Sequence, residues 1–221
     1  MNRFLVPAAL AFLSFNAAAV PTFYTDLTSF QNQLSSSTTI DFEGIVADNQ
    51  YGTVEGGAFD LRPSTVIDGV TFSVNAGTLG VSGKDGPVDG SPYDSALLFS
   101  NNGNAITVDL TSAGTGFTSI GGFFGDINSS GSLGTLSLFG SSGLLDVQNI
   151  IAADMGLGTP SNFFGWTVDT GDVTKVVFNL SQPFEGIDNL VYGTTSTVPE
   201  PSIVWLLGSG LALIGFVRRR A

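Results

Sequence analysis

The segment VTKVVFNL, residues 173–180, decides the fold because its side chains alternate in character along the chain. Val176, Phe178 and Leu180 fall on one face of an extended strand. The residues between them, together with Lys175, fall on the opposite face. Strands of this half-polar kind belong to antiparallel sheets that have one buried face and one wet face. The segment therefore predicts a sheet that packs on one side only.

The same two-residue period recurs between glycine-rich turns in AITVDL (105–110) and LGTLSLFG (133–140). Further segments rich in β-branched and aromatic residues lie at 38–44, 69–74, 95–100, 117–127, 144–150, 163–169 and 186–193. About ten short strands without intervening helices are typical of a sandwich or barrel. We therefore expect an all-β fold, an antiparallel two-sheet sandwich resembling a jelly roll.

One helical pattern interrupts this series near the N-terminus. Leu27, Phe30 and Leu34 recur at i, i+3 and i+7, and Asp26 precedes them as an N-cap residue. A short helix is therefore predicted within residues 27–34.

The N-terminal 19 residues have the composition of an export signal. Arg3 precedes an apolar stretch at 4–15, and alanines occupy positions 17–19. This order of charged, apolar and small residues is typical of a secretory signal peptide, so we expect cleavage close to Ala19. The sandwich is then expected to occupy residues 20–193.

The C-terminal residues combine a tether, an apolar run and a basic end. Residues 194–202 are expected to form the tether, and 203–221 a single transmembrane helix with its basic tail. The run at 203–217 would be about 22 Å long as a helix, short against a bilayer core of about 30 Å. Arg218, Arg219 and Arg220 are expected to stay cytoplasmic by the positive-inside rule.

The composition excludes several classes of chemistry. The chain has no histidine and no cysteine, which rules out Ser-His-Asp triads, imidazole metal sites, thiolate catalysis and disulfides. The remaining metal ligands are carboxylates, amides and carbonyls, which suit hard ions such as calcium.

Between the terminal segments the chain is strongly acidic. Residues 20–197 contain 18 acidic and three basic residues, a net charge of −15. Nucleic acid is excluded as a partner because phosphate backbones need lysines and arginines to displace their counterions. Anionic polymers are poor partners too, unless a divalent cation bridges them.

The tail resembles the PEP-CTERM sorting signal of Gram-negative bacteria. The residues that carry the resemblance are VPEPS (198–202), the apolar run after it and the terminal arginines. In that family the Pro-Glu-Pro segment is the recognition site of an exosortase, a membrane-embedded transpeptidase-like enzyme. The resemblance implies that Pro199, Glu200 and Pro201 form the sorting motif, with Arg218, Arg219 and Arg220 as the basic stop.

This likeness implies an exported protein that is anchored in the inner membrane as a precursor. It would then be processed and placed at the cell surface or in the extracellular matrix, where exopolysaccharide is an expected partner. Prolines fix φ and cannot join a helix, so the motif is expected to stay extended outside the bilayer. In this interpretation the chain is a substrate and we expect it to be no enzyme.

Three carboxylates in the body form a candidate calcium site. Asp41 and Glu43 lie two residues apart, so a strand would present both on one face. By resemblance to jelly-roll binding modules, where first and last strands often share a structural calcium, Glu43 and Asp188 are expected to meet at an ion. Asp41 or backbone carbonyls would complete its oxygen shell. The alternative is that these carboxylates are solvated charges at strand edges.

Two other functions stay open from the residues alone. Trp166, Tyr51, Tyr93 and Tyr192 offer rings for stacking on sugars, as in carbohydrate-binding modules, although a core role for Trp166 is an equal alternative. A glycoside hydrolase would need two facing carboxylates in a cleft. Acidic residues are plentiful, but no pair stands out.

Overall fold

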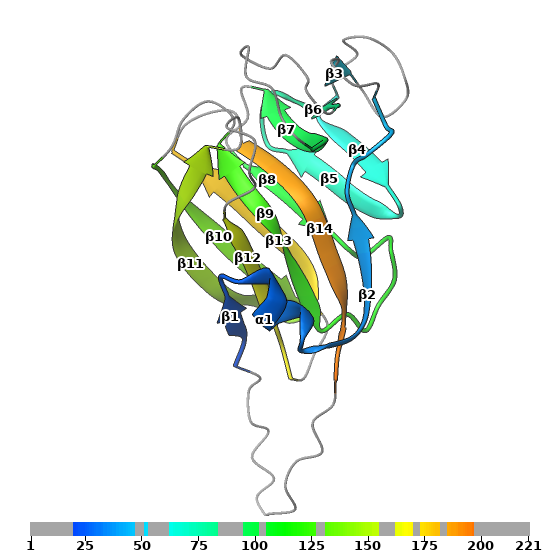
Figure 1. Cartoon of the computed structure of the whole chain (residues 1–221), viewed down its shortest axis with the longest axis vertical. Coiled ribbons are helices and arrows are strands. Elements are labelled where there is room, and N and C mark those ends of the chain that lie inside the picture. The colour runs from blue at the N-terminus through cyan, green and yellow to red at the C-terminus, as the bar shows by residue number, and fades with distance from the viewer. Residues whose placement is uncertain are drawn as a thin grey trace, which may run out of the picture.

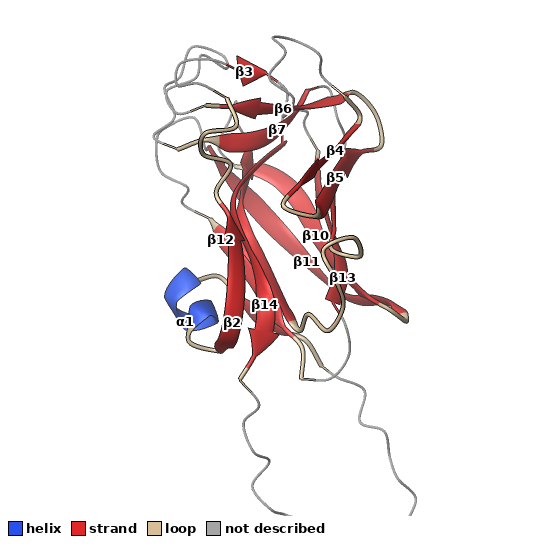
Figure 2. Ribbon diagram, turned by 90° about the vertical axis from the view of Figure 1, so that its right-hand side faces the viewer, coloured by secondary structure: helices blue, strands red, loops and turns tan. Residues whose placement is uncertain are grey.

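The computed structural model describes residues 20–46, 51–52, 62–83, 95–101, 105–126, 131–154, 162–169, 173–181 and 185–196. These residues form 14 strands and one short helix, α1 (Leu27–Gln31) (Figure 1). The prediction of an all-β fold is confirmed. The strands form two antiparallel sheets, which Figure 2 shows from the side.

The first sheet is built around β14, the last described strand. β14 pairs with β9 along one side and with β7 and then β2 along the other. The strands of this sheet are β1 (Thr22–Tyr24), β2 (Leu34–Ile40), β3 (Tyr51–Gly52), β6 (Thr78–Ser82), β7 (Leu97–Asn101), β9 (Ser119–Asp126), β12 (Phe163–Thr167) and β14 (Glu185–Thr195).

The second sheet has the order β11, β10, β13, β8, β5, β4. Its strands are β4 (Ser64–Ile67), β5 (Val70–Val74), β8 (Ile106–Asp109), β10 (Ser132–Gly140), β11 (Gly143–Asp154) and β13 (Val173–Leu180). The end of β11 also pairs with the end of β9, in parallel, through two residue pairs. This short parallel contact joins the two sheets and departs from the expected antiparallel pairing.

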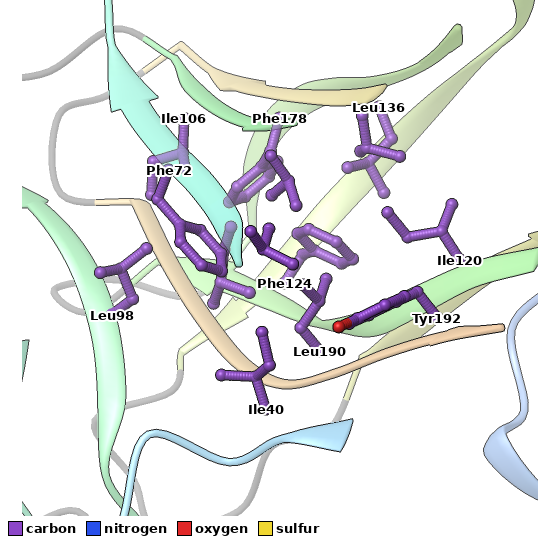
Figure 3. Packing of buried hydrophobic residues seen from close by; sticks show 14 of the residues in the cluster. Ile40, Phe72, Leu98, Ile106, Ile120, Phe124, Leu136, Phe178, Leu190 and Tyr192 are labelled. Atoms are coloured by element: carbon purple, nitrogen blue, oxygen red, sulfur yellow. The ribbon is translucent and has the colours of Figure 1, made fainter. Parts of the chain in front are cut away.

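The core lies between the sheets, as Figure 3 shows. Phe124 of β9 and Phe178 of β13 are almost fully buried, and their ring centroids lie 5.3 Å apart across the two sheets. The alternation predicted for 173–180 is confirmed, since Val176, Phe178 and Leu180 are buried whereas Asn179 is exposed. The burial of this one face by the opposite sheet is what makes the architecture sandwich-like.

Helix α1 covers the outer face of the first sheet. Phe30 is fully buried there against Phe163 of β12 and Val191 of β14. The predicted cap is confirmed, because the Asp26 carboxylate accepts a hydrogen bond of 2.7 Å from the Ser29 amide. The helix ends at Gln31, earlier than predicted, because the chain enters β2 at Leu34.

The predicted segments and the observed strands differ mainly in their ends. The strand expected at 38–44 runs from Leu34 to Ile40, and the one expected at 186–193 continues to Thr195. Strands β1, β3, β4 and β6 were not predicted, and the first three are only two to four residues long.

The predicted signal peptide at 1–19, the Pro-Glu-Pro motif and the transmembrane segment at 203–217 all lie outside the described residues. Within the described ranges, no helix is long and apolar enough to cross a membrane.

Candidate functional site

Strands β2 and β14 bring together acidic residues that lie about 145 positions apart in the chain. The two strands pair antiparallel, with Leu190 opposite Ile40 and Tyr192 opposite Thr38. The pairing ends with Ile40 opposite Leu190. Asp41 follows Ile40 directly in the chain, and Asp188 precedes Leu190 by two residues. The approach of an early and a late strand, which the resemblance to jelly-roll modules implied, is therefore present.

A β-bulge in β14 sets the direction of Asp188. Asp188 lies opposite Phe123 of β9 and Val191 lies opposite Gly121, so β14 contains one extra residue between these pairs. Asn189 adopts a left-handed φ of 46°, which asparagine tolerates better than most residues. Because of the extra residue, Ile187 and Leu190 both reach the core. Asp188 then points to the outer face of the sheet.

The chain turns sharply after β2. Phe42 has a φ of 60° and is buried, with its ring centroid 5.6 Å from that of Phe72 in the second sheet. This anchored aromatic leaves Asp41 and Glu43 exposed on either side of it. The Asp41 carboxylate accepts a hydrogen bond of 3.1 Å from the Glu43 amide. Asp41 and Glu43 thus belong to a turn, and not to one face of a strand as expected.

Glu43 and Asp188 converge on the start of the segment that leads into β7. The Glu43 Oε1 atom accepts hydrogen bonds from the Ser95 hydroxyl at 3.2 Å and from the Ala96 amide at 3.0 Å. Ser95 also lies against Asp188, whose Oδ1 atom accepts a bond of 2.6 Å from the Asn189 amide. The single Ser95 proton can serve only one of the two carboxylates at a time.

Asp188 is 1% exposed, and its surroundings disfavour a negative charge. Burial raises the pKa of Asp188 to about 6, hydrogen bonds from Ser95 and Asn189 lower it, and the charge of Glu43 raises it further. The pair therefore combines one exposed carboxylate, Glu43, with one buried carboxylate, Asp188.

Asp41 does not complete a three-carboxylate group. Among the residues that the structure describes, no three acidic side chains gather in a way that would hold a metal ion. A cation between Glu43 and Asp188 would draw its other oxygens from hydroxyls, backbone carbonyls or solvent. The calcium assignment stays a prediction.

The described aromatic candidates for sugar stacking are buried. Trp166 is 0% exposed in the core, where its indole Nε1 donates a hydrogen bond of 2.8 Å to Asp146. Tyr192 is 5% exposed and packs edge-on against Phe117. The side chains of Tyr51 and Tyr93 lie outside the described part of the chain. Trp166 and Tyr192 therefore have structural roles.

Sequence reasoning missed a second acidic pair, Asp126 and Glu185, which lie directly opposite each other at the ends of β9 and β14. Both side chains are 0% exposed. The strand period contained a signal for them, because Asp126 lies two residues after Phe124 and Glu185 two residues before Ile187. Each acid therefore falls on the core face of its strand.

The remaining information on function comes from the residues after β14. Residues 197–221 match the family model of the PEP-CTERM protein-sorting motif. The predicted resemblance of the tail is thereby confirmed, and the motif supports an exported protein that is sorted by an exosortase. None of the curated proteins matches the chain.

The buried state of Asp188 gives stability a dependence on pH. Its folded pKa of about 6 lies above the ordinary value of 3.8. The stability that comes from its neutral form is therefore fully present below about pH 4 and is lost as the pH rises through 6. The free energy of unfolding of the wild type should therefore decline between pH 4 and pH 8, and we expect a smaller decline in Asp188→Asn. Urea denaturation over this pH range, with a chelator present, measures the difference.

The exposed Asp169 supplies a matched control, since Asp169→Asn removes one carboxylate outside the site. The free energy of unfolding of this variant is expected to decline with pH as much as that of the wild type. Parallel profiles for Asp188→Asn and the wild type would contradict the prediction.

Proposed function

We propose that the chain is the precursor of a structural or interaction protein of a Gram-negative bacterium. It is exported, held in the inner membrane by residues 203–217, processed by an exosortase at the Pro-Glu-Pro motif and placed at the cell surface or in the extracellular matrix. The observation that carries this proposal is the match of residues 197–221 to the PEP-CTERM protein-sorting motif. The N-terminal signal-peptide pattern at 1–19 agrees with it.

The geometry of the sandwich supports delivery by a C-terminal tail. The start of β1 and the end of β14 lie at the same end of the molecule (Figure 1). The amide of Ser196, the last described residue, donates a hydrogen bond of 2.8 Å to the Gln33 carbonyl. The chain is therefore hydrogen-bonded to the domain as far as the residue before the matched motif. A membrane-anchored precursor would thus present its opposite end, near β3 and β6, away from the bilayer. A jelly-roll-like sandwich is the fold we infer for this displayed domain.

A role without catalysis is part of the proposal. Asp126 and Glu185 face each other but are fully buried, so no glycoside reaches them. In the other acidic pair, Asp188 is buried and Glu43 is occupied by Ser95 and Ala96. Neither pair offers an accessible acid and base on two sides of a substrate.

Exopolysaccharide of the matrix is the proposed partner of the displayed domain. Strand β2 exposes five consecutive hydroxyl residues, from Ser35 to Thr39. The Ser36 and Thr194 hydroxyls lie 2.8 Å apart across β2 and β14, so this surface is held in place. Hydroxyl groups suit neutral sugars, whereas the negative charge of the domain would require a bridging cation for an acidic polymer.

C-terminal mass mapping of the mature protein in its native host tests the sorting proposal. We expect the surface fraction to lack Arg218, Arg219 and Arg220, and Glu200→Ala to leave the precursor unprocessed in the inner membrane. Thr197→Ala, in the tether outside the Pro-Glu-Pro motif, is the matched control and is expected to be processed. Surface protein that retains Arg220 would contradict the proposal.

Calcium binding by the displayed domain is the second candidate function. The observation that favours it is the convergence of Glu43 and Asp188 on Ser95. Calcium added to the purified full-length chain would then raise its melting temperature, and Asp188→Asn would abolish part of that rise. An unchanged melting temperature in the wild type would remove this candidate.

A further inference from the structure

A second polar cluster is enclosed within the sandwich, at the end away from the described termini. It contains Asp126 of β9, Glu185 of β14, Ser100 of β7 and Ser132 of β10. Three of these side chains are 0% exposed, and Ser132 is 8% exposed. Such burial of two carboxylates carries a large desolvation penalty unless their charge is compensated.

The strand period shows that all four side chains point into the core. Ser100 and Asp126 each follow a core residue by two positions, namely Leu98 and Phe124. Glu185 precedes the core residue Ile187 by two positions. Ser132 lies four positions before Leu136 in β10, so both sheets contribute to the cluster.

The two carboxylates are held in place from different sides. Glu185 and Asp126 are direct partners in the β14–β9 ladder, where opposed Cβ atoms lie about 4.5–5.5 Å apart. The Ser132 hydroxyl donates a hydrogen bond of 2.6 Å to the Asp126 Oδ2 atom. The Leu180 amide, at the end of β13, donates a longer one of 3.4 Å to Glu185 Oε1.

Two oxygens in the cluster have no such partner. Within the described part of the chain, Glu185 Oε2 and Ser100 Oγ make no hydrogen bond, although both are buried. The Ser100 hydroxyl lies near Glu185 and partly offsets the rise of its pKa, but the two groups do not meet in hydrogen-bonding geometry. Buried polar atoms without partners are rare in proteins, and such atoms are typical of sites that bind a water molecule or an ion.

We propose that Asp126 and Glu185 bind one divalent cation of the calcium class inside the sandwich, with the Ser100 hydroxyl as a neutral ligand. A doubly charged ion would balance two carboxylates, and calcium accepts carboxylate, hydroxyl and carbonyl oxygens at 2.3–2.6 Å. Ser132 and the Leu180 amide position the two acids. This site lies on the core side of β14, whereas Asp188 lies on the outer side, so the two acidic pairs are separate.

The charge of the site agrees with this assignment. Burial raises the pKa of Glu185 to about 7, with Asp126 adding to the rise. A bound cation would lower the pKa of Glu185 again, because it favours the ionised carboxylate. Calcium binds the ionised carboxylate, so binding by Glu185 should be stronger at pH 8, above its pKa, than at lower pH.

Thermal melting of the chelator-treated full-length chain in detergent at pH 8 tests the proposal, with calcium chloride as the ligand. The wild type is expected to melt roughly 5–10 °C higher when calcium exceeds its Kd by 100-fold. Glu185→Gln keeps the shape and the acceptor for Leu180, and it is expected to lose the part of this rise that Asp188→Asn retains. Asp26→Asn, which keeps an N-cap residue on the surface, is the control that retains it.

Ser100→Ala is a second test variant, which keeps the proposal testable if Glu185→Gln fails to fold. Removing a buried hydroxyl without a partner should leave the calcium-free melting temperature unchanged or higher. The same change is expected to weaken calcium affinity about tenfold, a result that a merely structural role of Ser100 would not produce.

The other outcomes overturn the proposal. A calcium response that survives in Glu185→Gln but disappears in Asp188→Asn assigns the ion to the outer pair. No calcium response in the wild type, together with a higher melting temperature for Glu185→Gln at pH 8, would mean that the cluster holds no cation. The melting temperature and the calcium affinity do not depend on processing by an exosortase, so neither result tests the proposed sorting.

Discussion

Replacing Phe178 by alanine is expected to lower the free energy of unfolding by about 3–5 kcal/mol. Phe178 is 0% exposed and stands in β13 with its ring 5.3 Å from that of Phe124 in the opposite sheet. The ring fills space between the two sheets, and the surrounding side chains of a close-packed core relax only partly into the cavity that its removal leaves. Most of the lost transfer free energy would therefore remain uncompensated.

Urea denaturation of the full-length chain, followed by the circular dichroism of its strands, measures this loss. Leu133 of the neighbouring strand β10 offers a control because its side chain is 64% exposed. Leu133→Ala is expected to change the stability by about 0.5 kcal/mol or less. A loss below about 1 kcal/mol for Phe178→Ala would mean that the two sheets do not pack through this ring.

A methyl group on Gly193 is expected to break the contact between β14 and β2, at a cost of about 3 kcal/mol or more. Its Cβ atom would overlap the Ser36 carbonyl oxygen and would lie 2.8 Å from the Ser37 Cα atom. These atoms belong to the backbone of β2, so no side chain can rotate away. Strand β2 would have to move, and the turn that carries Glu43 would move with it.

Gly122 of the adjacent strand β9 is the matched control for this substitution. A Cβ atom there would meet its nearest neighbour, the Leu190 Cα atom, at 3.4 Å, which is an ordinary contact. Chemical denaturation should show a much larger loss for Gly193→Ala than for Gly122→Ala. Equal stability of the two variants would refute the close approach of β2 to β14.

The alternating segments could be predicted well because each has a single buried face. Residues 173–180 were expected as one strand, and β13 has the same bounds. The segments around β9, β12 and β14 were harder to delimit. These strands are buried on both faces, by the core and in part by α1, so they lack a clear alternation.

The candidate sites depended on pairings that no local pattern contains. The approach of Glu43 to Asp188 was expected only by resemblance to jelly-roll modules, and its geometry depends on the bulge at Asn189 and the left-handed Phe42. Asp41 was expected to share a strand face with Glu43, but the chain leaves β2 before reaching it. The strand period placed Asp126 and Glu185 on core faces, yet it could not show that these faces meet.

By itself the sequence determined the all-β class, the Asp26 cap and the sorting motif at 197–221. These features are local, since they depend on side-chain period, on hydrogen bonds three residues apart or on contiguous residues. Only the tertiary structure decided that Glu185 faces Asp126 across 59 positions of sequence and that Asp188 points the other way. The reason is that strand order and register are set by how two whole sheets bury their faces together, and a single inserted residue in β14 reverses which side chains enter the core.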